Sequence, residues 1–419
     1  MTKFPIAFNP DWTSSVQRRS LSLAGVKLTG RFRKLRTDLS RRVLGPLRYR
    51  TEIAIASLGK TASRSGPIRV GLVSDGAEIT SEEQFNPLAA FRSDLRRKLG
   101  VISLKCSLDD VLRSPQAHLA PFNIVLLKLS FRKNRSEALR TVEIIRTATR
   151  SPLIYFDGDD DLCIQWPELL SCVDLYIKKH VFRDRSQYCR PMVGKSNLTD
   201  YVHETFGVSF SHDPIAAHTD LVPTVQIPKI KAGYNLALDR KILDLYQATK
   251  PRSIFGTRRD VDIIFRGNVP NDWMGKLREP LRSALELMRN SHRVVTPDKR
   301  VTAQDYYQEL TSSKICISPF GYGEICWRDF EAVLCGALLV KPDMSHVETN
   351  PDIYRPFETY VPVKWNFSDL EERCNYYLKH EDERLKITKA AFDALDGFYK
   401  NGGFVHSFAH ILEQVSPSS

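Results

Sequence analysis

Three charged residues, Glu324, Arg328 and Glu331, stand four and three positions apart within ISPFGYGEICWRDFEAVLCGALLVKPD, residues 317–343. The stretch has the pattern of a strand, a glycine turn, a helix and a second strand. If 324–337 form one helix, the three charged side chains lie on one face, because residues three and four apart are neighbours. The apolar residues Phe330, Val333, Leu334 and Ala337 then lie on the opposite face. Such a helix is either amphipathic with a surface ion pair or one wall of a binding site.

The glycine turn favours the binding site. Gly321 and Gly323 allow the backbone to approach a ligand closely. The free N–H groups of a helix start favour phosphate, and the Arg328 guanidinium adds a fixed double donor. A carboxylate such as Glu331 accepts hydrogen bonds from a ribose diol, and Glu324 is suited to sugar hydroxyls.

An acidic cluster, DGDDD, follows the apolar segment LIYF and contains Asp157, Asp159, Asp160 and Asp161. A D-x-D pair can hold Mg²⁺ or Mn²⁺ against a sugar-nucleotide diphosphate. Alternatively, Asp157 at the strand end is a general base for an acceptor hydroxyl. A third interpretation is an Asx turn followed by a helix N-cap. The polar residues after the next strand are interpreted mainly as exposed loop residues: Lys178, Lys179, His180, Lys195, Asn197 and Asp200.

The combination SPFGYGE, then R..FEA, then CGALLVKP resembles the donor-binding segment of GT-B glycosyltransferases. It is closest to the exostosin-like and CgeB-like "glycosyltransferase family 1" branches. The resemblance covers this segment closely and residues 68–400 loosely. The common GT-B signature has two glutamates with seven residues between them, whereas six residues separate Glu324 from Glu331 here.

The resemblance implies roles for individual residues. Glu331 would hold the nucleotide ribose, and Glu324 the sugar or its phosphate, so that Glu324 joins Asp157 as a candidate catalytic residue. The segment IIFRGN resembles the first strand and turn of a donor domain. The implied donor-binding set, besides Glu331, is Arg266, Gly267, Asn268, Phe320, Gly321, Tyr322, Gly323 and Arg328. GT-B enzymes generally need no metal, so the resemblance implies neither a metal ion nor a cofactor, with a UDP- or GDP-sugar as co-substrate.

Strands that alternate with helices predict two parallel-sheet α/β domains. The strands expected in the first are 68–74, 123–129, 152–157 and 174–179, with helices at 87–99 and 135–149. The second has strands at 261–268, 292–297, 314–320, 337–342 and 360–364, with helices at 274–290 and 303–313. Pro280 is expected in the first turn of its helix or at a kink. Further helices are expected at 369–379, 381–396 and 402–415.

The predicted fold is therefore α/β, GT-B, with two Rossmann-like domains that face an interdomain cleft. Ligands of open parallel sheets bind beyond the carboxyl ends of the strands. The domain boundaries are a basic amphipathic segment at 1–65, an acceptor domain at 66–230 and a donor domain at 231–395. The last unit, 396–419, is a helix expected to cross back to the N-terminal domain.

The net charge of +12 comes mostly from the N-terminal segment, where residues 16–50 hold eleven Lys/Arg and one Asp. Three interpretations of this segment stay open: docking to an anionic membrane surface or another partner, phosphate binding, and a helix packed on the protein itself. The nearly neutral remainder argues against a nucleic-acid partner. No apolar run of about 18 residues predicts a transmembrane helix, and no apolar N-terminal region predicts a signal peptide. The eight scattered cysteines predict reduced thiols, and no His/Cys spacing predicts zinc.

These patterns and the resemblance predict a metal-independent glycosyltransferase that moves a sugar from a nucleotide sugar to a hydroxyl of a glycan or lipid-linked glycan. Its expected location is cytoplasmic, with peripheral attachment to the inner face of a membrane. One alternative is a non-catalytic nucleotide- or carbohydrate-binding protein on the same scaffold. The other is a metal-dependent transferase that uses DGDDD.

Overall fold

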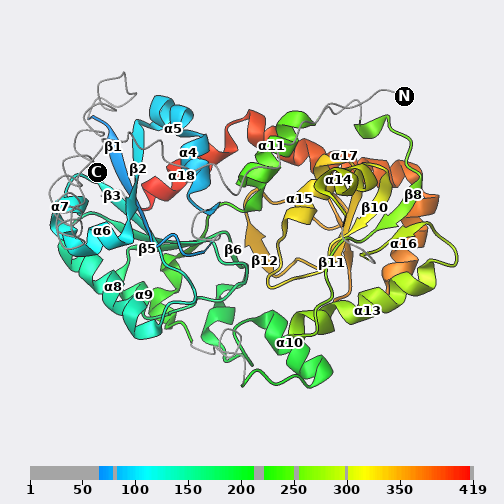
Figure 1. The fold of residues 1–419 in the computed structure, drawn as a ribbon, viewed down its shortest axis with the longest axis horizontal. Helices are drawn as coiled ribbons and strands as arrows, with labels where there is room; N and C mark the ends of the chain where they lie inside the picture. The colour runs from blue at the N-terminus through cyan, green and yellow to red at the C-terminus, as the bar shows by residue number, and fades with distance from the viewer. Residues whose placement is uncertain (1–65, 79–82, 212–220, 250–253, 298–300, 416–419) are drawn as a thin grey trace, which may run out of the picture.

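The computed structural model describes residues 66–78, 83–211, 221–249, 254–297 and 301–415. The basic segment at 1–65, for which the sequence predicts amphipathic helices, lies outside these residues. The described chain forms two lobes, each built around a parallel sheet (Figure 1). None of its helices is long and apolar enough to cross a membrane.

The first lobe contains a six-stranded parallel sheet in the order β2-β1-β3-β4-β5-β7. These strands are β2 (Val101–Ser107), β1 (Ile68–Ser74), β3 (Ile124–Lys128), β4 (Leu153–Asp157), β5 (Leu175–Lys178) and β7 (Ile230–Ala232). Every residue of β3, β4 and β5 is buried, because helices cover both faces of a parallel sheet. The helices are α4 (Asn86–Ala90), α5 (Arg92–Leu99), α6 (Leu108–Arg113), α7 (Pro115–Leu119), α8 (Arg135–Ala148), α9 (Leu169–Cys172) and α10 (Asn197–Phe206). Short 3₁₀ helices are η2 (Arg185–Cys189), η3 (Thr224–Lys229) and η4 (Leu236–Leu238).

The second lobe contains a five-stranded parallel sheet in the order β13-β11-β10-β8-β9. The strands are β13 (Val361–Val363), β11 (Leu338–Pro342), β10 (Ser313–Ile317), β8 (Val261–Ile264) and β9 (Val294–Val295). Its helices are α11 (Arg240–Ala248), α13 (Trp273–Met288), α14 (Ala303–Thr311), α15 (Trp327–Leu334), α16 (Leu370–Lys379) and α17 (Glu381–Lys400). The prediction of two parallel-sheet, Rossmann-like α/β domains is confirmed.

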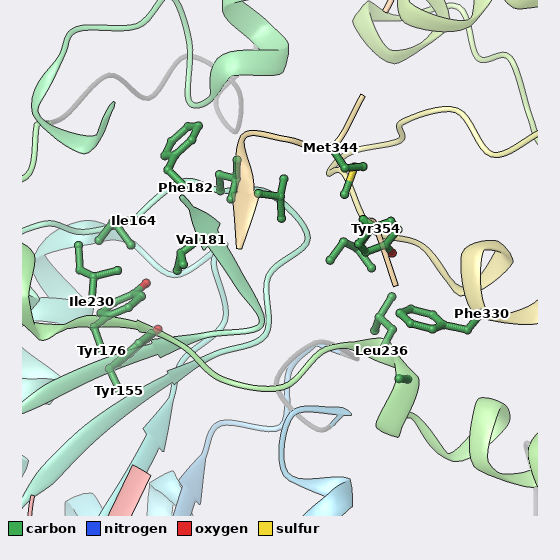
Figure 2. Packing of buried hydrophobic residues seen from close by; sticks show 14 of the residues in the cluster. Tyr155, Ile164, Tyr176, Val181, Phe182, Ile230, Leu236, Phe330, Met344 and Tyr354 are labelled. Carbon is green, nitrogen blue, oxygen red and sulfur yellow. The ribbon is translucent and has the colours of Figure 1, made fainter. Parts of the chain in front are cut away.

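Two features join the lobes. The short strands β6 (His180–Phe182) and β12 (Val347–Thr349) come from different lobes and pair antiparallel. The last helix, α18 (Gly403–Glu413), follows α17 of the second lobe, yet Phe404 and Phe408 pack with Val70 and Leu88 of the first. A buried cluster also continues between the lobes, from Tyr155 and Tyr176 through Val181 to Tyr354 and Phe330 (Figure 2).

Several predicted elements differ from the observed ones. The helix expected at 324–337 begins only at Trp327, so Glu324 is not helical. The helix expected at 87–99 is two helices, α4 and α5, which meet at Phe91. Pro280 lies in the interior of α13 rather than in its first turn. The strands β2, β6, β7 and β12 were not predicted, because they are short or carry polar residues at an edge of the sheet.

Candidate functional site

The acidic loop of the first lobe and the glycine turn of the second lobe are in direct contact. A Cβ added to Gly323 would lie 1.5 Å from the carbonyl oxygen of Asp160, so only glycine fits there. Beside this contact, the Lys195 ammonium lies 5.0 Å from the centre of the Tyr322 ring. Two segments that the sequence predicts as site elements therefore meet at one place between the lobes.

Glu324 lies at this junction and is wholly buried, between a histidine from each lobe. Its carboxylate oxygens are 3.3 Å from His180 Nε2 and 3.5 Å from His346 Nε2. Burial alone raises the pKa of Glu324, but the hydrogen-bonded His180 and the nearby His346 hold it well below its usual range. Burial lowers the pKa of His180, despite the carboxylate beside it. The predicted face shared by Glu324 and Arg328 is therefore absent, and Glu324 joins the lobes.

Arg328, in the first turn of α15, points to the end of β8. Its Nε and Nη2 both donate to the Arg266 carbonyl oxygen, at 3.1 and 2.7 Å. The guanidinium also lies 5.5 Å from the centre of the Phe265 ring. A Cβ added to Gly267 would lie 2.7 Å from Arg328 Nη2, so the predicted RGN turn is in contact with this guanidinium.

The start of α15 is fixed by a buried polar network around Asp329. The carboxylate accepts hydrogen bonds from Cys326 N and Tyr354 OH, at 3.1 and 2.8 Å, and lies 3.2 Å from Lys341 Nζ. A carboxylate that accepts the first N–H groups of a helix sets where the helix begins. The helix therefore starts after Cys326, and Arg328 is held at the carboxyl edge of the second sheet.

A second guanidinium at this edge, Arg278 of α13, was not predicted from the sequence. Arg278 Nε donates to the Phe320 carbonyl oxygen at 2.8 Å, and Nη1 donates to that of Asn268. Burial and the nearby charge of Arg328 lower the pKa of Arg278 to about 10. Within helix 274–290, nothing in the sequence distinguishes Arg278 from the other charged residues.

Among the described residues, neither Arg278 nor Arg328 forms an ion pair with a carboxylate; backbone carbonyls hold both. Two like charges at the end of a parallel sheet repel each other until an anion lies between them. Phosphate suits this arrangement, because the guanidinium donors are planar and fixed. The carbonyl oxygens of Phe320 and Asn268 position Arg278, and Gly321 leaves room for its guanidinium.

Arg266 is placed differently from the prediction. Its guanidinium donates to both oxygens of Glu309, each at 2.7 Å, and to the Thr296 carbonyl oxygen at 2.8 Å. The Arg266 side chain is thus held in a bidentate ion pair, and the backbone carbonyl of Arg266 accepts the hydrogen bonds from Arg328. Next to it, a cavity of about 750 Å³ opens at the ends of β8 and β9. Its lining includes Phe265, Asn268 and Thr296, and its volume suits a small ligand.

Glu331 is also buried, on the inner side of α15. Its carboxylate accepts hydrogen bonds from Tyr306 OH at 2.8 Å and Tyr307 OH at 3.0 Å, and lies 2.6 Å from Lys241 Nζ. The structure does not bring Glu331 together with Glu324 on one helical face. A ribose diol would have to replace one of these tyrosine hydroxyls.

The four aspartates of DGDDD pair with four lysines. Asp157 lies 3.1 Å from Lys128 Nζ and 2.9 Å from Lys178 Nζ, and accepts from Tyr176 OH at 2.7 Å. The other pairs are Asp159 with Lys128, Asp160 with Lys179 and Asp161 with Lys195. Lys178, Lys179, His180, Lys195 and Asp200 are buried, so their interpretation as exposed loop residues was wrong, and Asn197 is half-buried.

This pairing bears on both chemical interpretations of the acidic cluster. Burial raises the pKa of Asp157, but the charges of Lys128 and Lys178 hold it well below its usual range. A buried carboxylate with a low pKa is a poor general base, because it neither reaches an acceptor nor retains a proton near neutral pH. Each of these carboxylates already has a lysine ammonium group within 3.1 Å, which opposes a second cation, so the geometry does not favour a D-x-D metal site.

Comparisons with known proteins add one family match. Residues 248–401 match a family model described as "Glycosyl transferase-like", which is the part of the chain that carries Arg278, Arg328 and Glu331. No curated protein matches the chain significantly. Whether the chain is closer to the exostosin-like or the CgeB-like branch stays a prediction.

Several solved structures are similar at low sequence identity. A glycosyltransferase from Rickettsia africae ESF-5 is 12% identical, with 84% of this chain and 100% of that chain covered and a TM-score of 0.46. An alpha-glucosyltransferase in complex with UDP is 10% identical, with 81% and 99% covered and a TM-score of 0.43. Sucrose-phosphate synthase from Thermosynechococcus elongatus is 10% identical, with 83% and 98% covered and a TM-score of 0.41.

Proposed function

We propose that the protein is a nucleotide-sugar-dependent glycosyltransferase that binds the donor diphosphate between Arg278 and Arg328. The observation that carries this proposal is the pair of guanidinium groups, held by backbone carbonyls at the carboxyl edge of the second sheet. The family match over residues 248–401 supports the same class of reaction.

The geometry suggests how the donor would lie. The nucleoside would enter the cavity lined by Phe265, Asn268 and Thr296. The centre of the Phe265 ring lies 5.5 Å from the Arg328 guanidinium, and the Asn268 carbonyl oxygen accepts a hydrogen bond from Arg278. Fixed positive charge stabilises the departing nucleoside diphosphate, and preorganised groups of this kind are the main source of catalysis in many transferases. We therefore propose a UDP- or GDP-sugar as donor, with no metal ion required.

The proposed acceptor is a hydroxyl of a glycan or lipid-linked glycan. The motive is the basic segment 16–50, which lies outside the described residues and whose charge suits an anionic membrane surface. Attachment to the inner face of a membrane through this segment is part of the same proposal.

The donor site is tested first by a thermal-shift screen with UDP-, GDP-, CMP- and dTDP-sugars, in which the donor class stabilises the protein. Calorimetry with the selected nucleoside diphosphate then compares the wild type with Arg278→Ala and Arg328→Ala. Each substitution removes charge-assisted hydrogen bonds and is expected to weaken binding by about 1.5–3 kcal/mol, or roughly 10- to 150-fold.

Lys276→Ala is the matched control, since Lys276 lies on the same helix as Arg278 and pairs with Glu279 on the surface. It should leave the affinity unchanged. Equal affinity in wild type and both arginine variants would refute the diphosphate site.

A second candidate is a nucleotide-binding protein without transferase activity. It is favoured by the burial and low pKa of both predicted catalytic carboxyl groups, Asp157 and Glu324. Release of free UDP from UDP-glucose, or of the corresponding diphosphate from the selected donor, distinguishes the two. A binding protein shows affinity without release.

A further inference from the structure

Glu83 is a partly exposed carboxyl group at the junction of the lobes that neither motif includes. It comes nine residues after the end of β1 and lies near Gly158, which directly follows β4 at the carboxyl edge of the first sheet. The next residue, Gln84, is fixed by Tyr234, whose hydroxyl donates to the Gln84 carbonyl oxygen. Glu83, Gly158 and Asp239 line a cavity of about 10 Å³, which is the room that one water molecule needs.

The charged groups that face Glu83 come from three elements. Asp239 is the N-cap residue of α11, Asp160 belongs to the acidic loop, and Lys179 follows β5. The pKa of Glu83 is raised to about 7, first by burial and then by the Asp239 carboxylate, with a smaller contribution from Asp160. The Lys179 ammonium acts in the opposite direction. This contrasts with Asp157 and Glu324, whose cationic or hydrogen-bonding partners hold their pKa values low.

Two of these neighbours, Asp160 and Asp239, also contact the segments that precede Arg328. The carbonyl of Asp160 is in contact with Gly323 of the glycine turn. The Trp327 indole, one residue before Arg328, faces the Asp239 carboxylate. Accordingly, α11 packs against both α4, which begins three residues after Glu83, and α15 (Figure 1). Glu83 therefore shares neighbours with both the acidic loop and the start of α15.

We propose that Glu83 is the general base of the transfer reaction, a proposal that rests on the function proposed above. The acceptor oxygen forms a bond to the anomeric carbon of the donor sugar. The bond between that carbon and the phosphate oxygen breaks, and the diphosphate leaves with the electron pair. The acceptor proton passes to the Glu83 carboxylate, directly or through one water in the cavity, and is then lost to solvent.

Of the candidate carboxyl groups, Glu83 meets both requirements of a base. It is reachable, whereas Asp157 and Glu324 are wholly buried. It also changes protonation state near neutral pH, where a base is most effective.

The test measures release of UDP from UDP-glucose with water as acceptor, or the same reaction with the GDP-, CMP- or dTDP-sugar selected by thermal shift. Rates are measured between about pH 5.5 and 8.5 for wild type, Glu83→Gln, Glu83→Asp and the control Glu143→Gln. Glu143 is an exposed residue of α8, far from the junction in sequence and fold. Calorimetry with the nucleoside diphosphate is run on each variant.

In the wild type, the rate should fall about tenfold per pH unit below about pH 7, as the carboxylate becomes protonated. Glu83→Gln should reduce the rate by roughly 10²- to 10⁴-fold and abolish this acidic limb, with diphosphate affinity unchanged. Glu83→Asp should retain the acidic limb at a reduced rate, and Glu143→Gln should behave as wild type.

Two outcomes overturn the proposal in distinguishable ways. If Glu83→Gln retains both the rate and the acidic limb while it binds the diphosphate normally, Glu83 is not the base and the transferase assignment stands. If the wild type neither binds a nucleoside diphosphate nor releases one from a nucleotide sugar, the proposed function fails and the role of Glu83 fails with it.

Discussion

Replacement of Asp157 by asparagine should destabilise the first lobe strongly, because Asp157 neutralises two buried lysines. The carboxylate, Lys128 and Lys178 are all wholly buried, with nitrogen–oxygen distances of 3.1 and 2.9 Å. Asparagine has nearly the same shape, so the substitution removes the charge and leaves the packing. Lys128 keeps Asp159, but Lys178 loses the carboxylate it pairs with among the described residues.

A buried charge without its partner costs about 3–5 kcal/mol. The amide oxygen of asparagine still accepts one hydrogen bond, so we expect the lower half of this range, about 3–4 kcal/mol. Asp393→Asn is the control, since the pair of Asp393 with Lys389 is exposed and should contribute less than about 0.5 kcal/mol.

Urea unfolding followed by the fluorescence of Trp166, which is buried in the first lobe, measures the loss. Because the folded pKa of Asp157 is depressed, its stabilisation is present above the unfolded pKa of about 3.9 and is lost as the pH falls below it. The difference between wild type and variant should therefore be largest near neutral pH and shrink in acid.

A loss no larger than that of Asp393→Asn would refute this account of the acidic cluster. A second variant keeps the test informative if Asp157→Asn does not fold. The double variant Asp157→Asn, Lys178→Met removes both charges and should recover part of the stability, since an apolar replacement of a buried ion pair is often neutral.

Three further predictions concern the junction and the donor site. Gly323→Ala forces a Cβ into the Asp160 carbonyl and should lower the free energy of unfolding by about 1–3 kcal/mol and reduce transfer. Gly397→Ala in helix α17 is the control and should be neutral or stabilising, because the added Cβ has no neighbour nearer than 4.0 Å. Equal midpoints of thermal unfolding for the two variants would contradict the contact between the loops. Because the folded pKa of Glu83 is raised to about 7, wild-type stability should fall as the pH rises from about 4.5 to 7. Glu83→Gln should remove that loss and gain about 1–2 kcal/mol at pH 8, after a discount for partial exposure, and a gain that does not depend on pH would argue against the raised pKa. Finally, EDTA should leave diphosphate release unchanged, and a loss of activity restored by Mg²⁺ or Mn²⁺ would revive the metal-dependent interpretation of DGDDD.

The strands of both sheets were predictable where their apolar runs are continuous, as in β1, β3, β4 and β10. Such runs reflect burial on both faces, which is a local property of the sequence. The strand β2 carries Ser103 and Lys105 at the edge of its sheet and was missed for that reason. The strands β6 and β12 have three residues each and exist through pairing between lobes, which leaves no local pattern.

The positions of the site residues were likewise predictable where local sequence determines them, and not where contacts between distant segments do. The spacing of Glu324, Arg328 and Glu331 fits a helix, but the hydrogen bonds of Asp329 start that helix at Trp327. Arg278 was missed because its importance comes from two carbonyl groups, one in each of two distant loops. Both errors come from contacts that helical periodicity does not encode.

The charged residues at the junction differ in the groups that surround them, and this difference sets their protonation and their availability to a ligand. Carboxyl groups beside cations or histidines, such as Asp157 and Glu324, stay ionised; Asp157 neutralises lysines inside the first lobe, and Glu324 joins the two lobes. Guanidinium groups that meet carbonyls, Arg278 and Arg328, keep their charge available for an anion. Glu83 is partly buried and lies beside other carboxylates, and both burial and these charges make its ionised form costly near neutral pH. A transferase needs fixed positive charge for the leaving group and one group that exchanges a proton with solvent. Arg278 and Arg328 are suited to the first role and Glu83 to the second, because their neighbours differ.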